Sequence, residues 1–263
     1  MVETVRTLTN LYRLGWDERN GGNLSYLLYD EDIEGYLDTD KVIRNIPMTF
    51  DATAIKGKVF LVTGTGKYFK NVEKDPEHNL GIVRIAKDGT TAELLWGYKD
   101  GGKFTSEFPA HMMSHISRLA VDPEHRVVMH SHPTYTIAMN TVCPVDDRDF
   151  THKLWQSNTE AVVVFPDGVG VLPWMVCGGR EIAVATSEKM KKYDVTVWAH
   201  HGIFVSGTTF DEAFGLCHTI EKSAEIAVKV RSVSHSKLQT ITRPMLRELA
   251  AAFKIKLAEI FMR

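Results

Sequence analysis

The segment His130-Ser131-His132 carries two imidazoles at a spacing that suits a metal ion. It closes the apolar run 127–129, which is typical of a buried strand. Alternate side chains of a strand point to the same face, so both rings can approach one ion at the roughly 2.0–2.1 Å of Zn–N bonds. The alternative is that both histidines pack on a half-buried strand face. A third ligand would favour the metal site.

A candidate third ligand lies at the end of a second apolar strand, in His200-His201-Gly202. Adjacent residues of a strand face opposite sides, so we expect at most one of these two histidines to join the pair. Gly202 would allow a turn or a close approach of the chain. Three histidines with one open coordination position are typical of a catalytic zinc site, where the ion polarises a carbonyl oxygen or activates water.

The remaining histidines and the cysteines show no comparable pattern. His111 and His115 are four residues apart on a predicted helix, but the glutamate of H-E-x-x-H is absent, so we expect a packed or surface role. Isolated histidines, expected to be solvated or hydrogen-bonded, are His78, His125, His152, His218 and His235. The cysteines, Cys143, Cys177 and Cys217, fit neither a disulfide framework nor a cysteine zinc ribbon. Any metal would therefore be held by histidine.

Glu107 and two glycine turns could complete a site. Glu107 follows Thr105 and Ser106, either of which could cap a helix there. The alternative to a chemical role is that Glu107, in the first turn of this helix, interacts favourably with the positive end of the helix dipole. Beside a metal, partial burial would raise its pKa and let it transfer protons at neutral pH. The turns at 20–23 (NGGN) and 63–67 (TGTGK) offer backbone N–H groups and side-chain donors that suit a phosphate.

The elements that must position these residues alternate between strands and helices. We predict an opening helix that ends near Gly15, a hairpin at Asp88-Gly89, and a helix from Thr105 or Ser106 to about Leu119. Further strands are predicted at 23–29, 58–63, 126–132, 161–165, 169–172, 195–200 and 203–205, and further helices at 133–141, 146–156 and 180–192, from about 211, and after 244. Because hairpins are interspersed, we expect one α/β domain over 1–263, with helices on both sides of a mixed, largely antiparallel sheet.

Composition excludes several classes of protein. The 263 residues carry 31 basic and 33 acidic side chains, a net charge of −2, so we expect no general attraction to nucleic acid or anionic membranes. The start of the chain lacks the apolar stretch of a signal peptide, and the least polar stretch, 161–179, is interrupted by aspartate, proline and glycine. No GxGxxG or GxxxxGK[ST] motif follows a strand. We expect a cytoplasmic protein.

Taken together, these segments resemble the class II, zinc-dependent sugar-phosphate aldolase family, and the resemblance covers nearly the whole chain in order. The matching segments are 15–24 (GWDERNGGNL), 62–67 (VTGTGK), 105–107 (TSE), 130–132 (HSH), Leu154-Trp155 through Glu160, 165–175 (FPDGVGVLPWM) and 201–202 (HG). The longest runs are specific to one branch of the family. Two departures are Thr65, where serine is expected, and Ser131, where cysteine is expected.

The resemblance implies a fold, a reaction and a set of site residues. The fold would be a three-layer α/β/α domain, and the reaction a retro-aldol cleavage of a ketose phosphate to dihydroxyacetone phosphate. One Zn²⁺ per subunit would bind to His130, His132 and His201, with Glu107 as acid/base. Substrate and phosphate contacts would be Asn20, Gly22, Asn23, Thr65, Gly66 and Ser106. Glu160 would reach into a neighbouring subunit's site, in a homotetramer.

Three alternatives stay open within the same superfamily. A fuculose-phosphate aldolase would catalyse the same type of cleavage on another sugar. A ribulose-5-phosphate 4-epimerase would re-add the aldehyde after rotation and release no dihydroxyacetone phosphate. An adducin-like interaction module would lack the metal histidines, so their presence in this sequence counts against it.

Overall fold

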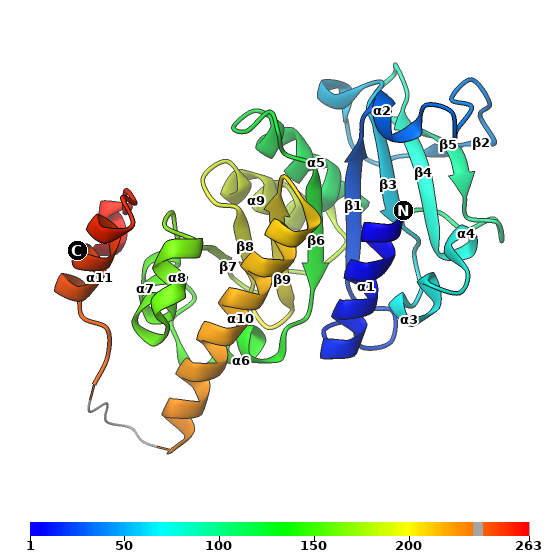
Figure 1. Ribbon diagram of the computed structural model, residues 1–263. Helices are drawn as coiled ribbons and strands as arrows, with labels where there is room; N and C mark the ends of the chain where they lie inside the picture. The colour runs from blue at the N-terminus through cyan, green and yellow to red at the C-terminus, as the bar shows by residue number, and fades with distance from the viewer. Residues whose placement is uncertain (234–238, 263) are drawn as a thin grey trace.

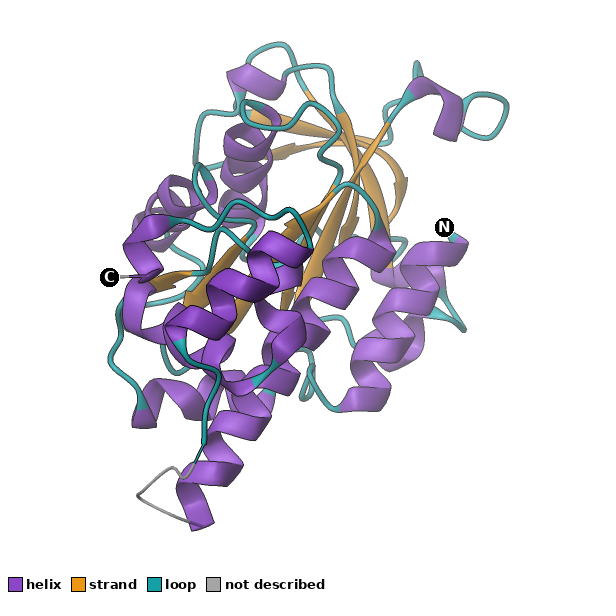
Figure 2. Cartoon of the chain, turned by 60° about the vertical axis from the view of Figure 1, so that its left-hand side comes forward, coloured by secondary structure: helices purple, strands orange, loops and turns teal. Residues whose placement is uncertain are grey.

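The computed structural model describes residues 1–233 and 239–262, and the prediction for His235 lies outside these residues. A nine-stranded sheet runs through the described part, with helices on both faces (Figures 1 and 2). Its strands are β1 (Asn23–Leu28), β2 (Arg44–Pro47), β3 (Val59–Thr63), β4 (Leu80–Ile85), β5 (Thr91–Gly97), β6 (Val127–Ser131), β7 (Gly170–Leu172), β8 (Val195–Trp198) and β9 (Gly202–Gly207). The predicted α/β class with a central sheet is confirmed.

The helices include seven of nine residues or more and several short ones. The longer ones are α1 (Val2–Leu14), α5 (Phe108–Leu119), α6 (Thr134–Val142), α7 (Asp147–Ser157), α9 (Arg180–Met190), α10 (Phe210–Val233) and α11 (Arg243–Ala252). The short ones are α2 (Asp30–Ile33), α3 (Phe69–Val72), α4 (Pro76–Asn79), α8 (Thr159–Val164), and the 3-10 turns η1 (Thr53–Ile55) and η2 (Glu259–Met262). No helix in the described ranges is long and apolar enough to span a membrane.

The strand order is β2-β5-β4-β3-β1-β6-β9-β8-β7. Every neighbouring pair is antiparallel except β7 and β8, which are parallel. The predicted mixed, largely antiparallel sheet is therefore confirmed. The first five strands of the chain form one side of the sheet and the last four the other, and β1 pairs with β6 where the two sides meet.

Alternation along β6 sorts its side chains between the two helical layers. Val127 and Met129 belong to the core that contains α1, α6, α7 and α10. Val128 belongs to the core on the opposite face, formed with α5 and α9. Two residues further along the same face, His130 stacks on Phe204, and the ring centroids are 4.5 Å apart. A buried apolar strand thus presents a histidine on the α5/α9 face of the sheet.

The helix α1 shows how local sequence sets an element's end. It ends at Gly15, whose φ of 73° is left-handed, and the Gly15 N–H donates to the carbonyl of Tyr12. Glycine adopts this conformation without the steric cost of a Cβ. Leu8 and Leu11 are fully buried, whereas Val2 and Tyr12 are exposed, so the buried face is narrower than the apolar pattern predicts.

Three predictions about elements are wrong. The predicted strand 161–165 is part of the helix α8, which begins where the Asn158 side chain accepts a hydrogen bond from the Glu160 N–H. A run of β-branched residues favours a strand, but the cap and the packing of Ala161 and Val162 in the core prevail. The edge strand β2 lies between the predicted strands 23–29 and 58–63, where no strand was predicted. The helix α5 begins at Phe108, and neither Thr105 nor Ser106 caps it.

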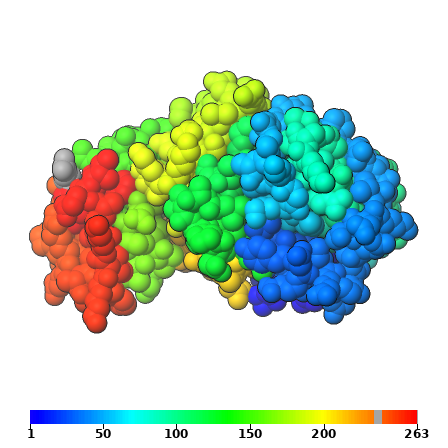
Figure 3. Space-filling view, turned by 90° about the horizontal axis from the view of Figure 1, so that it is seen from above, coloured from blue at the N-terminus to red at the C-terminus, as the bar shows by residue number. Residues whose placement is uncertain are grey.

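Seen from above, the molecule is elongated (Figure 3). Residues of the N-terminal strands lie at one end and α11 at the other. The middle of this length is where β1 meets β6, so a site at that junction draws on residues from both halves of the chain.

Candidate active site

The candidate residues gather at one end of the sheet. In the register of the sheet, Asn23 at the start of β1 lies opposite His130 near the end of β6. Ser131 lies opposite Ile203 near the start of β9, and the 63–67 turn follows β3 at the same end, because Ser25 pairs with Val62. Antiparallel pairing therefore brings together segments that are up to about 180 residues apart in the chain.

His130 and His132 direct one nitrogen each at a shared point. Their Nε2 atoms are 3.1 Å apart. The His130 Nδ1 lies 3.0 Å from the carbonyl oxygen of Ile203, and the His132 Nδ1 lies 2.9 Å from the Glu18 carboxylate. Both acceptors call for a proton on Nδ1, which leaves a lone pair on each Nε2. Two lone pairs that face each other at this distance repel unless a proton or a cation lies between them.

His201 is the third member of this group, and His200 is not. Strand β8 ends at Trp198 and β9 begins at Gly202, so both histidines lie in the turn between them. His200 has a left-handed φ of 62° and is exposed. His201 turns back toward β6, and its ring centroid is 5.0 Å from those of both His130 and His132. The expectation that at most one of the pair joins the group agrees with this geometry, although a turn and not strand alternation separates them.

Gly202 allows the two strand ends to approach this closely. A Cβ atom built on Gly202 would lie 2.4 Å from the carbonyl oxygen of Ser131 and about 3 Å from the rings of His130 and His132. No side chain fits in that space without moving the histidines. Of the two roles predicted for Gly202, a turn or a close approach of the chain, the structure shows the close approach.

The three histidines fit a tetrahedral zinc ion. One ligand nitrogen from each lies within 4.8 Å of the others, and tetrahedral coordination at 2.0–2.1 Å requires nitrogens about 3.3 Å apart. Burial is the main cause that lowers the pKa of His130, and it lowers that of His201 to about 4, so both rings are neutral, as metal ligands must be. The Nδ1 bonds to Ile203 and Glu18 orient the rings in the way that second-shell partners orient metal-bound histidines.

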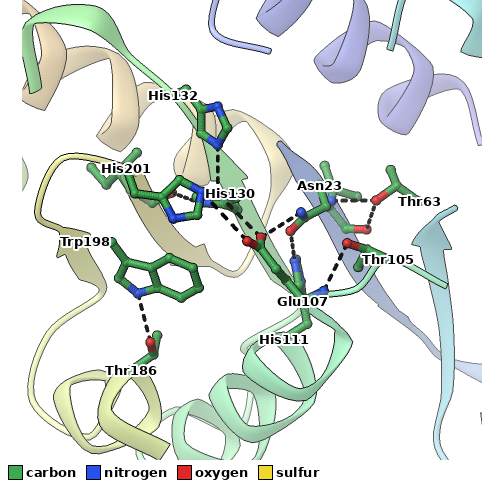
Figure 4. A network of polar contacts seen from close by, with 12 residues as sticks. Asn23, Thr63, Thr105, Glu107, His111, His130, His132, Thr186, Trp198 and His201 are labelled. Carbon is green, nitrogen blue, oxygen red and sulfur yellow. Dashed lines mark hydrogen bonds and ion pairs between the residues drawn. The ribbon is translucent and has the colours of Figure 1, made fainter. Parts of the chain in front are cut away.

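Glu107 lies beside the histidines, as Figure 4 shows. Its carboxylate is 3.4 Å from the His130 Nε2 and 3.9 Å from the His201 Nε2. The Asn23 amide donates to Oε2 at 2.8 Å, and the Thr105 Oγ accepts from the Glu107 N–H. Only 6% of Glu107 is exposed, and this burial raises its pKa to about 7. The group can therefore gain and lose a proton near neutrality.

The turn at 20–23 lies against the histidines, and the turn at 63–67 follows β3 at the same end of the sheet. Gly21 packs against the His132 ring, and Gly22, with φ 74°, lies against the carbonyl of His130. Asn20 is exposed at this turn. In the other turn Thr65 is half-buried, and Gly66 is exposed beside a pocket of about 400 Å³ that is also lined by Lys67 and Lys74. Lys67 pairs with Asp100, and Asp75 also lines the pocket, so Lys74 is the positive side chain there that would be left to attract a phosphate.

The other predicted site residues differ in where they lie. Asn23 is buried, and its amide is committed to Glu107 and His111. Ser106 is exposed next to Glu107 and close to Gly178. Glu160 is exposed on α8, which lies beyond β8 on the far side of β6 from β1 (Figure 1). The structure thus brings Gly22, Asn23 and Glu107 to the histidines, with Ser106 next to Glu107, and it does not bring Glu160 there.

Two features of the site were missed in the sequence. Cys177 is exposed, and its thiol, the Glu107 carboxylate and a His201 nitrogen lie within 4.8 Å of one another. The conclusion that only histidine could bind a metal here was therefore too narrow. The second feature is the set of contacts between His111 and Asn23. No spacing rule predicts either, because each depends on how distant segments pack.

The fold and the site define a class of protein, and comparisons with known proteins agree. Residues 2–228 match the family described as Class II Aldolase and Adducin N-terminal domain. The chain therefore belongs to this family, and it is a class II aldolase, an enzyme that cleaves carbon–carbon bonds.

Particular relatives are similar over nearly the whole chain. The rhamnulose-1-phosphate aldolase of Listeria monocytogenes serotype 4a (strain HCC23) is 54% identical, over 97% of this chain and 93% of its own length. That of Escherichia coli O81 (strain ED1a) is 47% identical, over 95% and 92%. Among solved structures, the sugar-phosphate aldolase from Thermotoga maritima superposes with a TM-score of 0.76 at 28% identity, over 89% of this chain and 96% of its own.

Proposed function

We propose that this protein is a zinc-dependent L-rhamnulose-1-phosphate aldolase. It would cleave L-rhamnulose 1-phosphate between C3 and C4 into dihydroxyacetone phosphate and L-lactaldehyde, a step of L-rhamnose degradation. The observation that carries the proposal is the convergence of three histidine nitrogens beside the buried Glu107. The name shared by the most similar relatives supports the choice of sugar.

The metal would bind to His130, His132 and His201, one zinc per subunit. When bound, zinc would supply positive charge that stabilises the enediolate left on the dihydroxyacetone phosphate half. The protein's own contribution is to orient the rings of His130 and His132, through Ile203 and Glu18. No lysine is needed for a Schiff base in this scheme.

Glu107 would act as the acid/base. In the cleavage direction the C4 hydroxyl loses its proton to solvent and the C3–C4 bond breaks. The protonated carboxyl of Glu107 then delivers a proton to C3, and the carboxylate takes a proton back from solvent. Its pKa of about 7 keeps both protonation states available at neutral pH. Asn23 donates to Oε2, which also lies 3.4 Å from the His130 Nε2, so Oε1, near His201, is left for the substrate.

The phosphate would be bound by the glycine turns, through Asn20, Gly22, Asn23, Thr65, Gly66 and Ser106. Fixing the phosphate fixes the distance between the reacting carbons and Glu107, which lowers the entropic part of the barrier. Because the Asn23 amide already bonds to Glu107 and His111, its part in substrate binding would be the smallest of these.

The active unit would be a homotetramer in the cytoplasm. Glu160, exposed and remote from the histidines of its own subunit, would complete the site of a neighbour. A carboxylate that the chain keeps far from its own site can act only in trans. This assignment rests on the family resemblance and on the position of α8.

An assay for dihydroxyacetone phosphate tests the proposal. The purified protein is given L-rhamnulose 1-phosphate, L-fuculose 1-phosphate or L-ribulose 5-phosphate, with and without a chelator. We expect release from the first substrate at the highest kcat/KM and loss of activity on chelation. Preference for the second would reassign the sugar, and conversion of the third without release would indicate an epimerase. Absence of both stoichiometric zinc and activity would favour an adducin-like module.

The Glu107→Gln variant tests the acid/base role. It keeps the size and the hydrogen bond from Asn23 but can neither deliver nor take up the proton, so we expect turnover to fall by about 10²–10⁴-fold while zinc content stays unchanged. Glu221→Gln is the matched control, because Glu221 is equally buried but binds the first turn of α6 through Tyr135 and Thr136. Near-normal turnover in Glu107→Gln would reassign the acid/base.

A further inference from the structure

A second set of histidines belongs to a continuous buried array of hydrogen bonds that ends on Glu107. The array runs from Glu107 to Asn23, His111, Ser25, His115 and His125. The Ser25 Oγ lies 2.7 Å from the His111 Nδ1 and 2.8 Å from the His115 Nε2. The His115 Nδ1 lies 2.9 Å from the His125 Nε2, and the His111 Nε2 contacts the Asn23 Oδ1. Ser25, His111 and His115 are fully buried, and 2% of His125 is exposed.

The direction of every hydrogen bond in this array follows from the bond between Asn23 and Glu107. Asn23 donates its amide N–H to Glu107, so its oxygen must accept from the His111 Nε2–H. Burial lowers the pKa of His111 to about 3, so the ring is neutral and its Nδ1 can only accept, from the Ser25 hydroxyl. That hydroxyl has one proton, so it must accept from the His115 Nε2–H.

The same reasoning continues to the far end. Burial lowers the pKa of His115, so its Nδ1 accepts from the His125 Nε2–H. His125 lies at a small pocket with Arg118, and burial, together with the positive charge of Arg118, lowers the pKa of His125 to about 3. All donors therefore point toward the carboxylate, and the acceptor end lies near a guanidinium. The Glu107 carboxylate at one end and the Arg118 guanidinium near the other favour this direction of the hydrogen bonds over the reverse.

We propose that Ser25, His111, His115 and His125 are positioning residues that lock the Asn23 amide with its N–H₂ toward Glu107. The reverse arrangement turns the amide oxygen to the carboxylate and every histidine to the Nδ1–H form. An amide oxygen next to the Glu107 carboxylate would repel that carboxylate and displace it from His130, His132 and His201. The array therefore selects the carboxylate geometry that the reaction uses. This inference rests on the proposed function for its effect on turnover.

The Ser25→Ala variant breaks the array without touching Asn23 or Glu107. It removes one oxygen, after which the His111 ring is free to take either neutral tautomer. We expect kcat to fall about tenfold, as for the loss of one hydrogen bond in the transition state, with KM and zinc content unchanged. Ser114→Ala is the matched control: Ser114 lies on α5 between His111 and His115, is fully buried, and its Oγ has no hydrogen-bond partner in the described structure. That variant should keep the wild-type kcat.

The tautomers themselves can be measured by ¹⁵N NMR of the zinc-loaded protein with labelled histidine. In the wild type we expect neutral Nε2–H forms of His111, His115 and His125, and in Ser25→Ala a mixture at His111. Equal kcat in Ser25→Ala and Ser114→Ala, or Nδ1–H at His111 in the wild type, would overturn the proposal. The NMR result does not depend on the substrate, so a wild type that cleaves no ketose phosphate would count against the proposed function and not against the array.

Discussion

The protein uses histidine in two opposite ways on the same face of its sheet. His130, His132 and His201 converge, so that three nitrogens point at one place with no hydrogen donor between them. His111, His115 and His125 follow one another in a line, and each passes its hydrogen bond to the next group. Burial lowers the pKa of His111 in one group and of His130 in the other, so both rings are neutral. Both groups end on Glu107.

The difference lies in what each ring nitrogen faces. In the converging group the outer nitrogen bonds to a carbonyl or a carboxylate, which leaves the inner lone pair for a cation. In the linear group each nitrogen from the His111 Nε2 to the His125 Nε2 has a partner of the right kind, so no lone pair inside the line is left for an ion. Residue type alone therefore does not identify a metal site; the unmatched lone pair does.

The largest effect should separate the two groups directly. We expect His132→Gln to lose stoichiometric zinc and to lower turnover by about 10³-fold, since a catalytic metal contributes several kcal/mol. The equivalent change in the linear group, His115→Gln, should keep the zinc. Metal content of both purified variants is the measurement, and zinc retained by His132→Gln would mean that the converging group is not the metal site.

A smaller effect is expected where the strand ends meet. Gly202→Ala should destabilise the protein by roughly 1–3 kcal/mol, as overpacking does, and weaken zinc binding, because the new Cβ would displace Ser131 and the His130 ring. The control is Gly215→Ala in α10, where a Cβ meets nothing within 4 Å. Thermal unfolding with and without zinc gives both quantities. Equal stability and equal stabilisation by zinc in the two variants would show that the strand ends can move apart at no cost.

The linear group should also leave a signature in acid. Because the folded protein holds His111 and His125 with pKa values of about 3, below the unfolded value of about 6.5, the unfolded state binds more protons between these limits. Stability is therefore lost as the pH falls from about 6.5 toward 3. His125→Gln keeps a donor but does not titrate, so its unfolding free energy should fall less steeply over this range. The unfolding free energies come from urea titrations at each pH. Equal dependence on pH in the wild type and His125→Gln would contradict the lowered pKa of His125.

The smallest effect concerns Cys177. The thiol is exposed, whereas Cys217 is buried with its pKa raised to about 12, so iodoacetamide should modify Cys177 first. A group attached there would crowd Glu107 and His201 and block turnover. Cys177→Ser should resist this inhibition, and its own kcat without iodoacetamide is the reference for the labelled variant. Mass spectrometry locates the label, and inhibition of Cys177→Ser would point to another target.

Periodicity and turn chemistry made most of the fold predictable. The alternation through β6 correctly placed His130 and His132 on one face, and the Asp88-Gly89 hairpin and the end of α1 at Gly15 follow from φ > 0 at glycine. The helix α8 was missed because a cap at Asn158 and tertiary packing outweigh the strand propensity of its valines.

The parts of the site that could not be predicted depend on long-range packing. Ser25 meets His111 and His115 across 86 and 90 residues, and nothing local to either segment signals the contact. Cys177 reaches Glu107 through the path of the loop before α9. Spacing identifies ligands that lie on one element, whereas ligands from different elements require the tertiary structure.

The left-handed backbone of His200 has a consequence for how this site can change over generations. That single torsion angle decides which of two adjacent histidines points at the metal group, yet the His200 side chain itself faces solvent. Asparagine or glycine would adopt the same angle readily, whereas a β-branched residue would resist it. Natural variation at position 200 should therefore be filtered by backbone conformation, and a survey of the residues that touch the metal or the sugar would overlook it.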